Sequence, residues 1–217
     1  MSVMVEVWGD YALFTRPELK VERVSYDVMT PSAARGLLEA IYWHPGMRWV
    51  VDRIYVLSPI HFTNIRRNEV SATLSAAKAR TAMSGGETEL YINTQDCIQQ
   101  RAAMVLQDVH YVIEAHFILT DKAGAEDNPG KFCDILRRRL EKGQCYHQPY
   151  FGTREFPAHF RAWKGGEPAT AYPDKDRELG LMLYDMDYSD PENIRPQFFR
   201  AELKRGVLDV GDREVFT

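Results

Sequence analysis

Cysteine is scarce in this chain, and the spacing of the few cysteines excludes two kinds of site. The 217 residues include three cysteines, at positions 97, 133 and 145. They form no C-x-x-C pair and have no zinc-type spacing with histidine, so the sequence predicts neither a structural zinc site nor a redox pair. An odd and sparse set of cysteines is typical of reduced thiols in a cytosolic protein.

Long apolar segments are also missing. No run approaches the roughly 20 apolar residues that a membrane helix needs. The first residues, MSVMVEVWGD, show no basic region followed by an apolar stretch, so we expect no signal peptide. The sequence therefore predicts a cytoplasmic protein that does not contact a membrane.

The chain lacks an excess of positive charge. Its net charge is −4 and its pI is about 5.9, which argues against a protein that coats nucleic acid nonspecifically. Residues 1–80, however, contain ten Lys and Arg against eight acidic residues, a local charge of +2. Any RNA-binding surface should therefore be local and lie near the N-terminal half.

Hydrophobic periodicity predicts a strand, a helix and a second strand at the start of the chain. Apolar residues alternate over residues 3–8, as in a half-buried strand. Thr30 followed by Pro31 is typical of a helix N-cap and first helical position. Apolar residues then recur at helical spacing until Pro45-Gly46 ends the helix. Alternation returns over residues 48–57 and predicts the next strand.

The same order of elements repeats further along the chain. Residues 109–120 alternate most clearly and predict a strand. Asn128-Pro129 repeats the N-cap and proline pattern and predicts a helix that continues to about Lys142. Between the two halves, the Ala-, Ser- and Gly-rich residues 71–90 predict a flexible insertion, and residues 95–106 a short helix.

Two strand–helix–strand units in this order predict an α+β chain. We expect a ferredoxin-like N-terminal domain over residues 1–150. Beyond residue 150, glycine and proline separate short apolar runs, which predicts a small antiparallel β-sheet domain over residues 151–217.

Four short motifs occur in a fixed order: GDYALFT from Gly9, IYW-x-P from Ile41, E-A-H-F from Glu114 and GTREFP from Gly152. Each motif is weak alone, but together they resemble the Cas-five family of CRISPR-associated proteins, in its type I-C (Dvulg-subtype) branch. The resemblance implies a ferredoxin-like domain of the RRM or RAMP type. It also implies a Cascade subunit that binds the 5′ tag of CRISPR RNA and cuts the precursor RNA without a metal or another cofactor. Its partners would be the CRISPR repeat RNA, the Cas-seven backbone and the Cas-eight large subunit.

The resemblance implies catalytic roles for Tyr42 and Lys131. Tyr42 is the tyrosine of the IYW-x-P motif, and Lys131 lies in the first helical turn after Asn128-Pro129, where phosphate is favoured. From the residues alone, Tyr42 is equally an ordinary tyrosine at the edge of the core, and Lys131 a solvated lysine. Relatives place a histidine directly after this lysine. This chain has Phe132 there, which completes an apolar helix face.

Three histidines, His44, His110 and His116, are candidates to replace the missing one, and we favour His44 and His116. Metal-free RNA cleavage uses the neighbouring 2′-hydroxyl as nucleophile and needs groups that exchange protons and a cation near the phosphate. Histidine suits proton exchange. His44 is two residues from Tyr42, and His116 lies beside Glu114 on the polar face of a predicted strand. Either could instead be an ordinary surface histidine. We predict no metal site.

Basic residues in two segments are candidates for contacts with RNA phosphates. Arg16, Lys20 and Arg23 lie in one predicted loop, and Arg66 and Arg67 follow a predicted strand. Such charges are equally typical of a solvated loop. The three arginines from residue 137 to 139 we interpret as a favourable charge run at a helix C-terminus.

The leading hypothesis is a metal-independent endoribonuclease that processes precursor CRISPR RNA and retains the 5′ tag within type I-C Cascade. The alternative is a weakly active or inactive cap of the RNA 5′ end, in which Phe132 marks the lost histidine. Metal-dependent cleavage of double-stranded DNA would need a carboxylate cluster that the sequence does not show convincingly. A generic interaction domain would bind repeat RNA weakly or without salt sensitivity.

Overall fold

The structure is a computed structural model that describes residues 2–19, 21–211 and 213–217. Its helices and strands, in chain order, are β1 (Val3–Ala12), β2 (Arg23–Val24), α1 (Pro31–Ile41), β3 (Met47–Val56), β4 (His61–Val70), α2 (Ala76–Met83), the 3-10 helix η1 (Thr94–Cys97), β5 (Ile98–Leu119), α3 (Pro129–Lys142), β6 (His159–Ala162), β7 (Arg177–Asp187), β8 (Arg195–Lys204), β9 (Val207–Asp209) and β10 (Val215–Phe216). Among the described residues, none of these helices is both long enough and apolar enough to cross a membrane.

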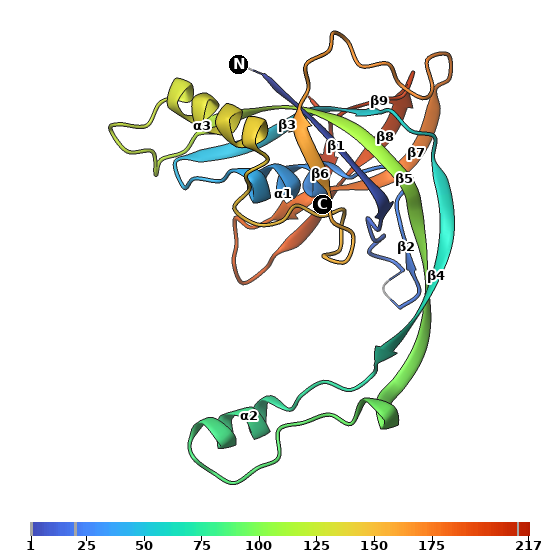
Figure 1. Cartoon of the computed structure of the whole chain (residues 1–217), viewed down its shortest axis with the longest axis vertical. Coiled ribbons are helices and arrows are strands. Elements are labelled where there is room, and N and C mark those ends of the chain that lie inside the picture. Colours follow the sequence, from blue (N-terminus) through green and yellow to red (C-terminus); the bar gives the residue numbers. More distant parts are fainter. Residues whose placement is uncertain (1, 20, 212) are drawn as a thin grey trace.

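A single sheet organises the chain (Figure 1). Its main path runs β10-β8-β9-β3-β5-β1-β6, while β2 and β4 also pair with β5, and β7 pairs with β8. The pairs of the main path are antiparallel, and among the described strands only β2 runs parallel to its neighbour β5. The prediction of an α+β chain is confirmed, with an extensive antiparallel sheet and few helices.

Helix α1 begins where the sequence predicts. The Thr30 hydroxyl accepts a hydrogen bond from the Ala33 amide at 3.2 Å, and Pro31 occupies the first turn. Its apolar face packs against β3 and β7. The helix ends at Ile41, so Tyr42 is the extended C-cap residue rather than part of the last turn. Tyr42 is thereby held at the point where the chain leaves α1 for β3.

Helix α3 repeats this start. The Asn128 side chain accepts a hydrogen bond from the Lys131 amide at 2.9 Å. The helix buries Phe132, Leu136 and Leu140, as its apolar spacing predicts. It ends at Gly143, whose φ of 63° is left-handed and therefore suits glycine. Its last turn carries the basic side chains Arg139 and Lys142.

The prediction of a helix over residues 95–106 is wrong. Only Thr94–Cys97 form a 3-10 turn, and β5 then runs for 22 residues. Alanines within this segment favour helix by propensity. However, β4 lies alongside and pairs with it from Val70↔Ile98 to His61↔Gln107. This long-range ladder supplies the backbone hydrogen bonds that a helix would otherwise have to supply.

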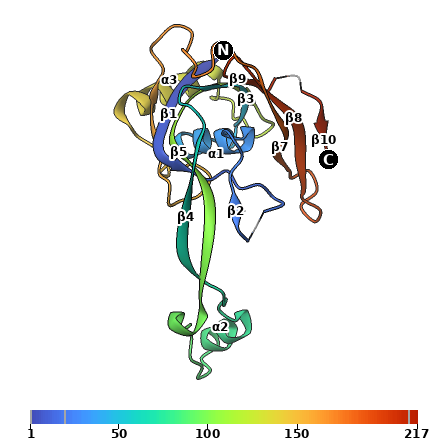
Figure 2. The same ribbon diagram turned by 90° about the vertical axis from the view of Figure 1, so that its right-hand side faces the viewer.

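The outer parts of β4 and β5 form a two-stranded ribbon that leaves the rest of the molecule (Figures 1 and 2). The segment at the far end of this ribbon carries α2, which buries none of its residues. The body, in contrast, has a continuous hydrophobic core with residues from Val5 to Val210. Strand β6 follows residue 150 but pairs with β1 in the central sheet.

Candidate functional site

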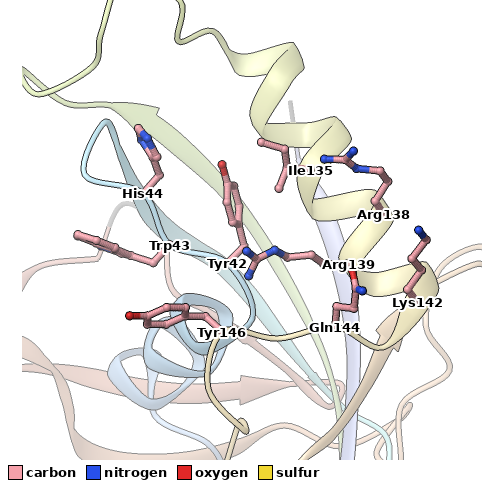
Figure 3. A pocket seen from close by; sticks show the side chains of 9 residues that line it. All are labelled: Tyr42, Trp43, His44, Ile135, Arg138, Arg139, Lys142, Gln144 and Tyr146. Atoms are coloured by element: carbon pink, nitrogen blue, oxygen red, sulfur yellow. The ribbon is translucent and has the colours of Figure 1, made fainter.

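The end of α1 and the outer side of α3 enclose a pocket with a volume of about 710 Å³ (Figure 3). The pocket is lined by two groups of residues: Tyr42, Trp43 and His44 after α1, and Ile135, Arg138, Arg139, Lys142, Gln144 and Tyr146 from α3 and the loop that follows it. It thus combines aromatic rings, an imidazole and three cationic side chains. We name it the Tyr42 pocket.

Tyr42 is buried apart from its polar end. Its ring lies 6.2 Å from the ring of Phe132 and 5.1 Å from the Arg139 guanidinium carbon, measured to ring centroids. In Figure 3 its hydroxyl points away from Arg139, toward the space between His44 and Ile135. Burial raises the pKa of Tyr42, and the opposing effect of nearby Arg139 does not cancel it. The phenol therefore remains protonated at neutral pH and can donate a proton, but it is a poor base.

Several groups hold the C-terminus of α1 against α3. A helix end leaves carbonyl oxygens without intrahelical partners. Here Arg139 donates to the Ile41 carbonyl at 2.5 Å, and the Trp49 indole donates to the Tyr42 carbonyl at 2.9 Å. The amides of Tyr146 and His147 both donate to the carbonyl of Ala40. The bonds from Arg139 and from the loop after α3 fix the α1 side of the pocket to the α3 side, and the bond from Trp49 fixes Tyr42 to β3.

Asp127 links Lys131 to His44. The Lys131 ammonium lies 3.0 Å from one oxygen of Asp127, and His44 Nδ1 lies 3.8 Å from the other. A hydrogen bond from the Gly124 amide, reinforced by Lys131, lowers the pKa of Asp127, so this carboxylate is ionised at neutral pH. The Gly46 amide donates to His44 Nδ1 at 3.0 Å. The neutral His44 ring therefore carries its proton on Nε2.

Phe132 lies in the core beneath these side chains. It is fully buried, and its ring centroid is 5.1 Å from that of His44 and 5.8 Å from that of Phe117. The position directly after Lys131 is therefore part of the apolar packing. His44 lies against Phe132, so an imidazole is present beside the position where the resemblance implies a histidine. Tyr42 and His44 both lie against Phe132 and both line the pocket. Lys131 reaches this region only through Asp127, which lies near His44, and it does not line the Tyr42 pocket.

His116 is not part of this region. Its Nδ1 lies 2.9 Å from both carboxylate oxygens of Asp52. Its neighbour on β5, Phe117, contacts Phe132, and successive strand residues point to opposite faces of a sheet. His116 therefore lies on the other face of the sheet from Phe132, and its predicted role as a substitute is not supported by its position.

Three of the predicted RNA-contacting arginines are engaged with carboxylates. Arg16 lies 3.2 Å from Asp27, Arg23 lies 3.0 Å from Glu69, and Arg67 forms an ion pair with Glu155. Arg66 alternates to the exposed side of β4 and has no ion-pair partner among the described residues. Lys20 lies outside the described residues. None of the described four lines the Tyr42 pocket.

Sequence reasoning missed much of the basic side of the pocket. Arg138 and Arg139 were assigned to a helix-terminal charge run and Lys142 to no role, whereas the structure places all three along the pocket. Arg138 and Lys142 are four residues apart and so share a helix face, a signal that the sequence contains. Arg137, in contrast, pairs with Asp134 at 2.9 Å and is not part of the lining.

In the parts of the chain that the structure describes, no three His, Cys, Asp or Glu side chains are grouped so that they could hold a metal ion. The three cysteines form no disulfide.

The sequence profile of a family described as CRISPR-associated protein (Cas_Cas5) matches residues 2–211. A protein of Mannheimia succiniciproducens named CRISPR pre-crRNA endoribonuclease Cas5d is 52% identical over 213 residues, covering 96% of this chain and 94% of that protein. A protein of Thermus thermophilus with the same name is 41% identical over 223 residues, covering 95% and 90% of the two chains.

Two solved structures share the fold. One, named Crystal Structure of CRISPR-associated Protein, has a TM-score of 0.72 at 22% identity and covers 100% of this chain and 97% of its own. The other, a functionally uncharacterized protein of Streptococcus mutans, has a TM-score of 0.70 at 21% identity with the same coverage. At these identities the likeness concerns the fold alone.

Proposed function

Because this chain belongs to the family of CRISPR-associated proteins described as Cas_Cas5, we propose that it is a pre-crRNA endoribonuclease that retains the 5′ tag of its product as a subunit of type I-C Cascade. The two relatives with 52% and 41% identity both carry the name of that activity. The observation that carries the proposal is the Tyr42 pocket, in which a protonated phenol lies beside cationic side chains.

The proposed reaction is attack of a 2′-hydroxyl on the adjacent phosphorus. The bond from phosphorus to the 5′ oxygen breaks, and the products are a cyclic 2′,3′-phosphate and a 5′-hydroxyl. Tyr42 donates its proton to the departing 5′ oxygen. Lys131 and Arg139 neutralise the charge that develops on the phosphate, and the Nε2 proton of His44 forms a hydrogen bond to a phosphate oxygen. The 2′-hydroxyl proton passes to water, because neither Tyr42 nor the Nε2 of His44 is arranged as a base.

Single-turnover cleavage of the protein's own repeat RNA, with a chelator present, tests this function. Replacing Tyr42 with Phe removes the proton donor and should lower the rate by roughly 10² to 10⁴ while RNA affinity stays the same. Lys131→Ala should lower the rate as well. Tyr188→Phe, an exposed tyrosine outside the Tyr42 pocket, is the matched control and should cleave normally. RNA that stays intact with excess parent protein would reject the endoribonuclease and favour the inactive cap.

Finer predictions about the fold, the location and the partners remain part of the proposal. The order β3-β5-β1-β6, with α1 and α3 as the connecting helices, supports a ferredoxin-like arrangement of the central strands. If the chain has two domains, the pairing of β6 with β1 favours a boundary after Ala162 rather than at residue 150. Four further points stay predictions. They are the flexibility of residues 71–90, a cytoplasmic location, binding to Cas-seven and Cas-eight subunits, and cleavage of double-stranded DNA.

A further inference from the structure

Trp43 differs from the other three tryptophans of the chain. Trp8 stacks on the His159 ring at 5.6 Å. The indoles of Trp49 and Trp163 each donate a hydrogen bond to a backbone carbonyl. The Trp43 side chain is 55% exposed and has neither a ring contact nor a hydrogen bond among the described residues. A large aromatic ring left exposed and unpartnered indicates a surface that contacts a ligand.

A second groove, with a volume of about 730 Å³, lies beyond Trp43 on the outer side of α1. Trp43 and Tyr146 line both this groove and the Tyr42 pocket, so the two hollows meet at these rings. Tyr146 is 68% exposed. In Figure 3 the two rings lie on the same side of Tyr42, away from Arg138 and Lys142.

The groove is held in place by the backbone and carries a cation. The amides of Tyr146 and His147 donate to the Ala40 carbonyl at 2.9 and 3.0 Å, which fixes this loop to α1. Arg154, at the far side of the groove, is exposed and has no ion pair within the described part of the chain. The one acidic residue of the lining, Glu39, is paired with an arginine of α1, Arg35, at 2.7 Å. Exposed rings with a free cation suit single-stranded nucleic acid.

We propose that Trp43 and Tyr146 bind a nucleobase of an unpaired RNA segment adjoining the phosphate that is cleaved, and that Arg154 contacts a phosphate further along that segment. This inference rests on the proposed function, since the segment is the flank of the precursor RNA that enters the Tyr42 pocket. Stacking accepts any base, because every base has a π-face. The rings therefore set affinity and position rather than sequence preference.

The test separates binding from cleavage by using a repeat RNA with a 2′-deoxy nucleotide at the scissile position, which prevents attack. Trp43→Ala should raise the Kd for this RNA by about 5- to 100-fold, the range that removal of one stacked base gives. Trp43→Phe should recover most of the affinity, because a ring is restored. Tyr188→Ala, an exposed tyrosine outside the groove, is the control and should bind like the parent.

With cleavable RNA at saturating protein, Tyr42→Phe should lose single-turnover rate and keep the parent's affinity, which separates loss of the proton donor from loss of a stacking ring. If neither the parent nor any variant cleaves the RNA, the proposed endoribonuclease activity is rejected. The Kd values for the 2′-deoxy RNA still decide whether Trp43 and Tyr146 bind a base. An unchanged Kd in Trp43→Ala overturns this inference. An unchanged Kd together with impaired assembly with a protein subunit also overturns it, and assigns the rings to a protein contact.

Discussion

Phe132 occupies the position where the family resemblance implies a histidine, and its burial determines what a substitution there can do. The side chain lies under Tyr42 and His44 and against Phe117, with no exposure to solvent. An imidazole at this depth would lose its hydration without gaining a partner, a cost of roughly 1–3 kcal/mol in mutational data. Histidine at this position would therefore act first on stability.

We predict that Phe132→His lowers the free energy of unfolding by roughly 1–3 kcal/mol and does not raise the rate of RNA cleavage. Urea denaturation and single-turnover cleavage measure the two quantities, and Phe132→Leu, which keeps the site apolar, is the comparison. A large gain in rate would contradict this prediction, because it would mean that the missing acid–base group limits the reaction.

Some site residues could be predicted from the sequence around them, and others depend on contacts between distant parts of the chain. The roles of Tyr42 and Lys131 were predicted from the family resemblance, while the sequence by itself indicated only that each lies near the end of a helix. Asp127 was missed, since its links to His44 and Lys131 depend on how the loop before α3 folds back. His116 could have been set aside, because the alternation of β5 already separates it from the apolar face.

At the scale of elements, the capping residues offer a matched pair of substitutions. Asn128 caps α3, which buries three large apolar side chains, and Ser75 caps α2, which buries none. We predict that Asn128→Ala lowers the free energy of global unfolding by about 1 kcal/mol. Ser75→Ala should leave it unchanged, because α2 can unfold without disturbing the core.

Urea denaturation monitored by tryptophan fluorescence measures both variants, since the tryptophans lie in the body rather than at the end of the ribbon. Equal losses in the two variants would show that α2 is coupled to the core, contrary to its complete lack of buried residues.

Both main helices were predictable because their caps and apolar faces are local patterns. The β4–β5 ribbon could not be predicted in this way, because the residues that pair between its two strands lie far apart in the sequence. Residues 98–106 have a composition that suits helix or strand, and only the neighbouring β4 decides between them.

At the scale of the whole molecule, Glu6 joins three strands of the central sheet. From β1 it accepts hydrogen bonds from Arg161 on β6 at 2.5 and 2.8 Å, and it lies 2.9 Å from His110 Nε2 on β5. The hydrogen bonds from Arg161 are the largest cause of a lowered pKa for Glu6, although burial opposes them.

A carboxyl whose pKa is lowered by folding stabilises the native state above its unfolded pKa, and this stabilisation is lost as the pH falls through the folded value. We therefore predict that the parent loses stability more steeply than Glu6→Gln between about pH 5 and pH 3. Urea denaturation across this range checks the slope. Parallel slopes would show that Glu6 titrates alike in the folded and unfolded chains.

The α+β class followed from the sequence, since two strand–helix–strand units are visible in its periodicity. The sequence did not predict that the C-terminal strands join the same sheet. It depends on β9 pairing with β3, across more than half of the chain. The sequence contains both partners, but no local pattern indicates that they meet.

Strand β5 also connects the far end of the ribbon to the body of the molecule (Figure 1). At about 3.3 Å per residue, its 22 residues extend for roughly 70 Å, less whatever its twist removes. One unbroken strand thus leads from η1, at the remote tip, to within eight residues of Asp127. The strand curves on the way (Figure 1), and Asp108 within it has a left-handed φ of 53°, so the ribbon leaves the body at an angle that the backbone of β5 itself sets.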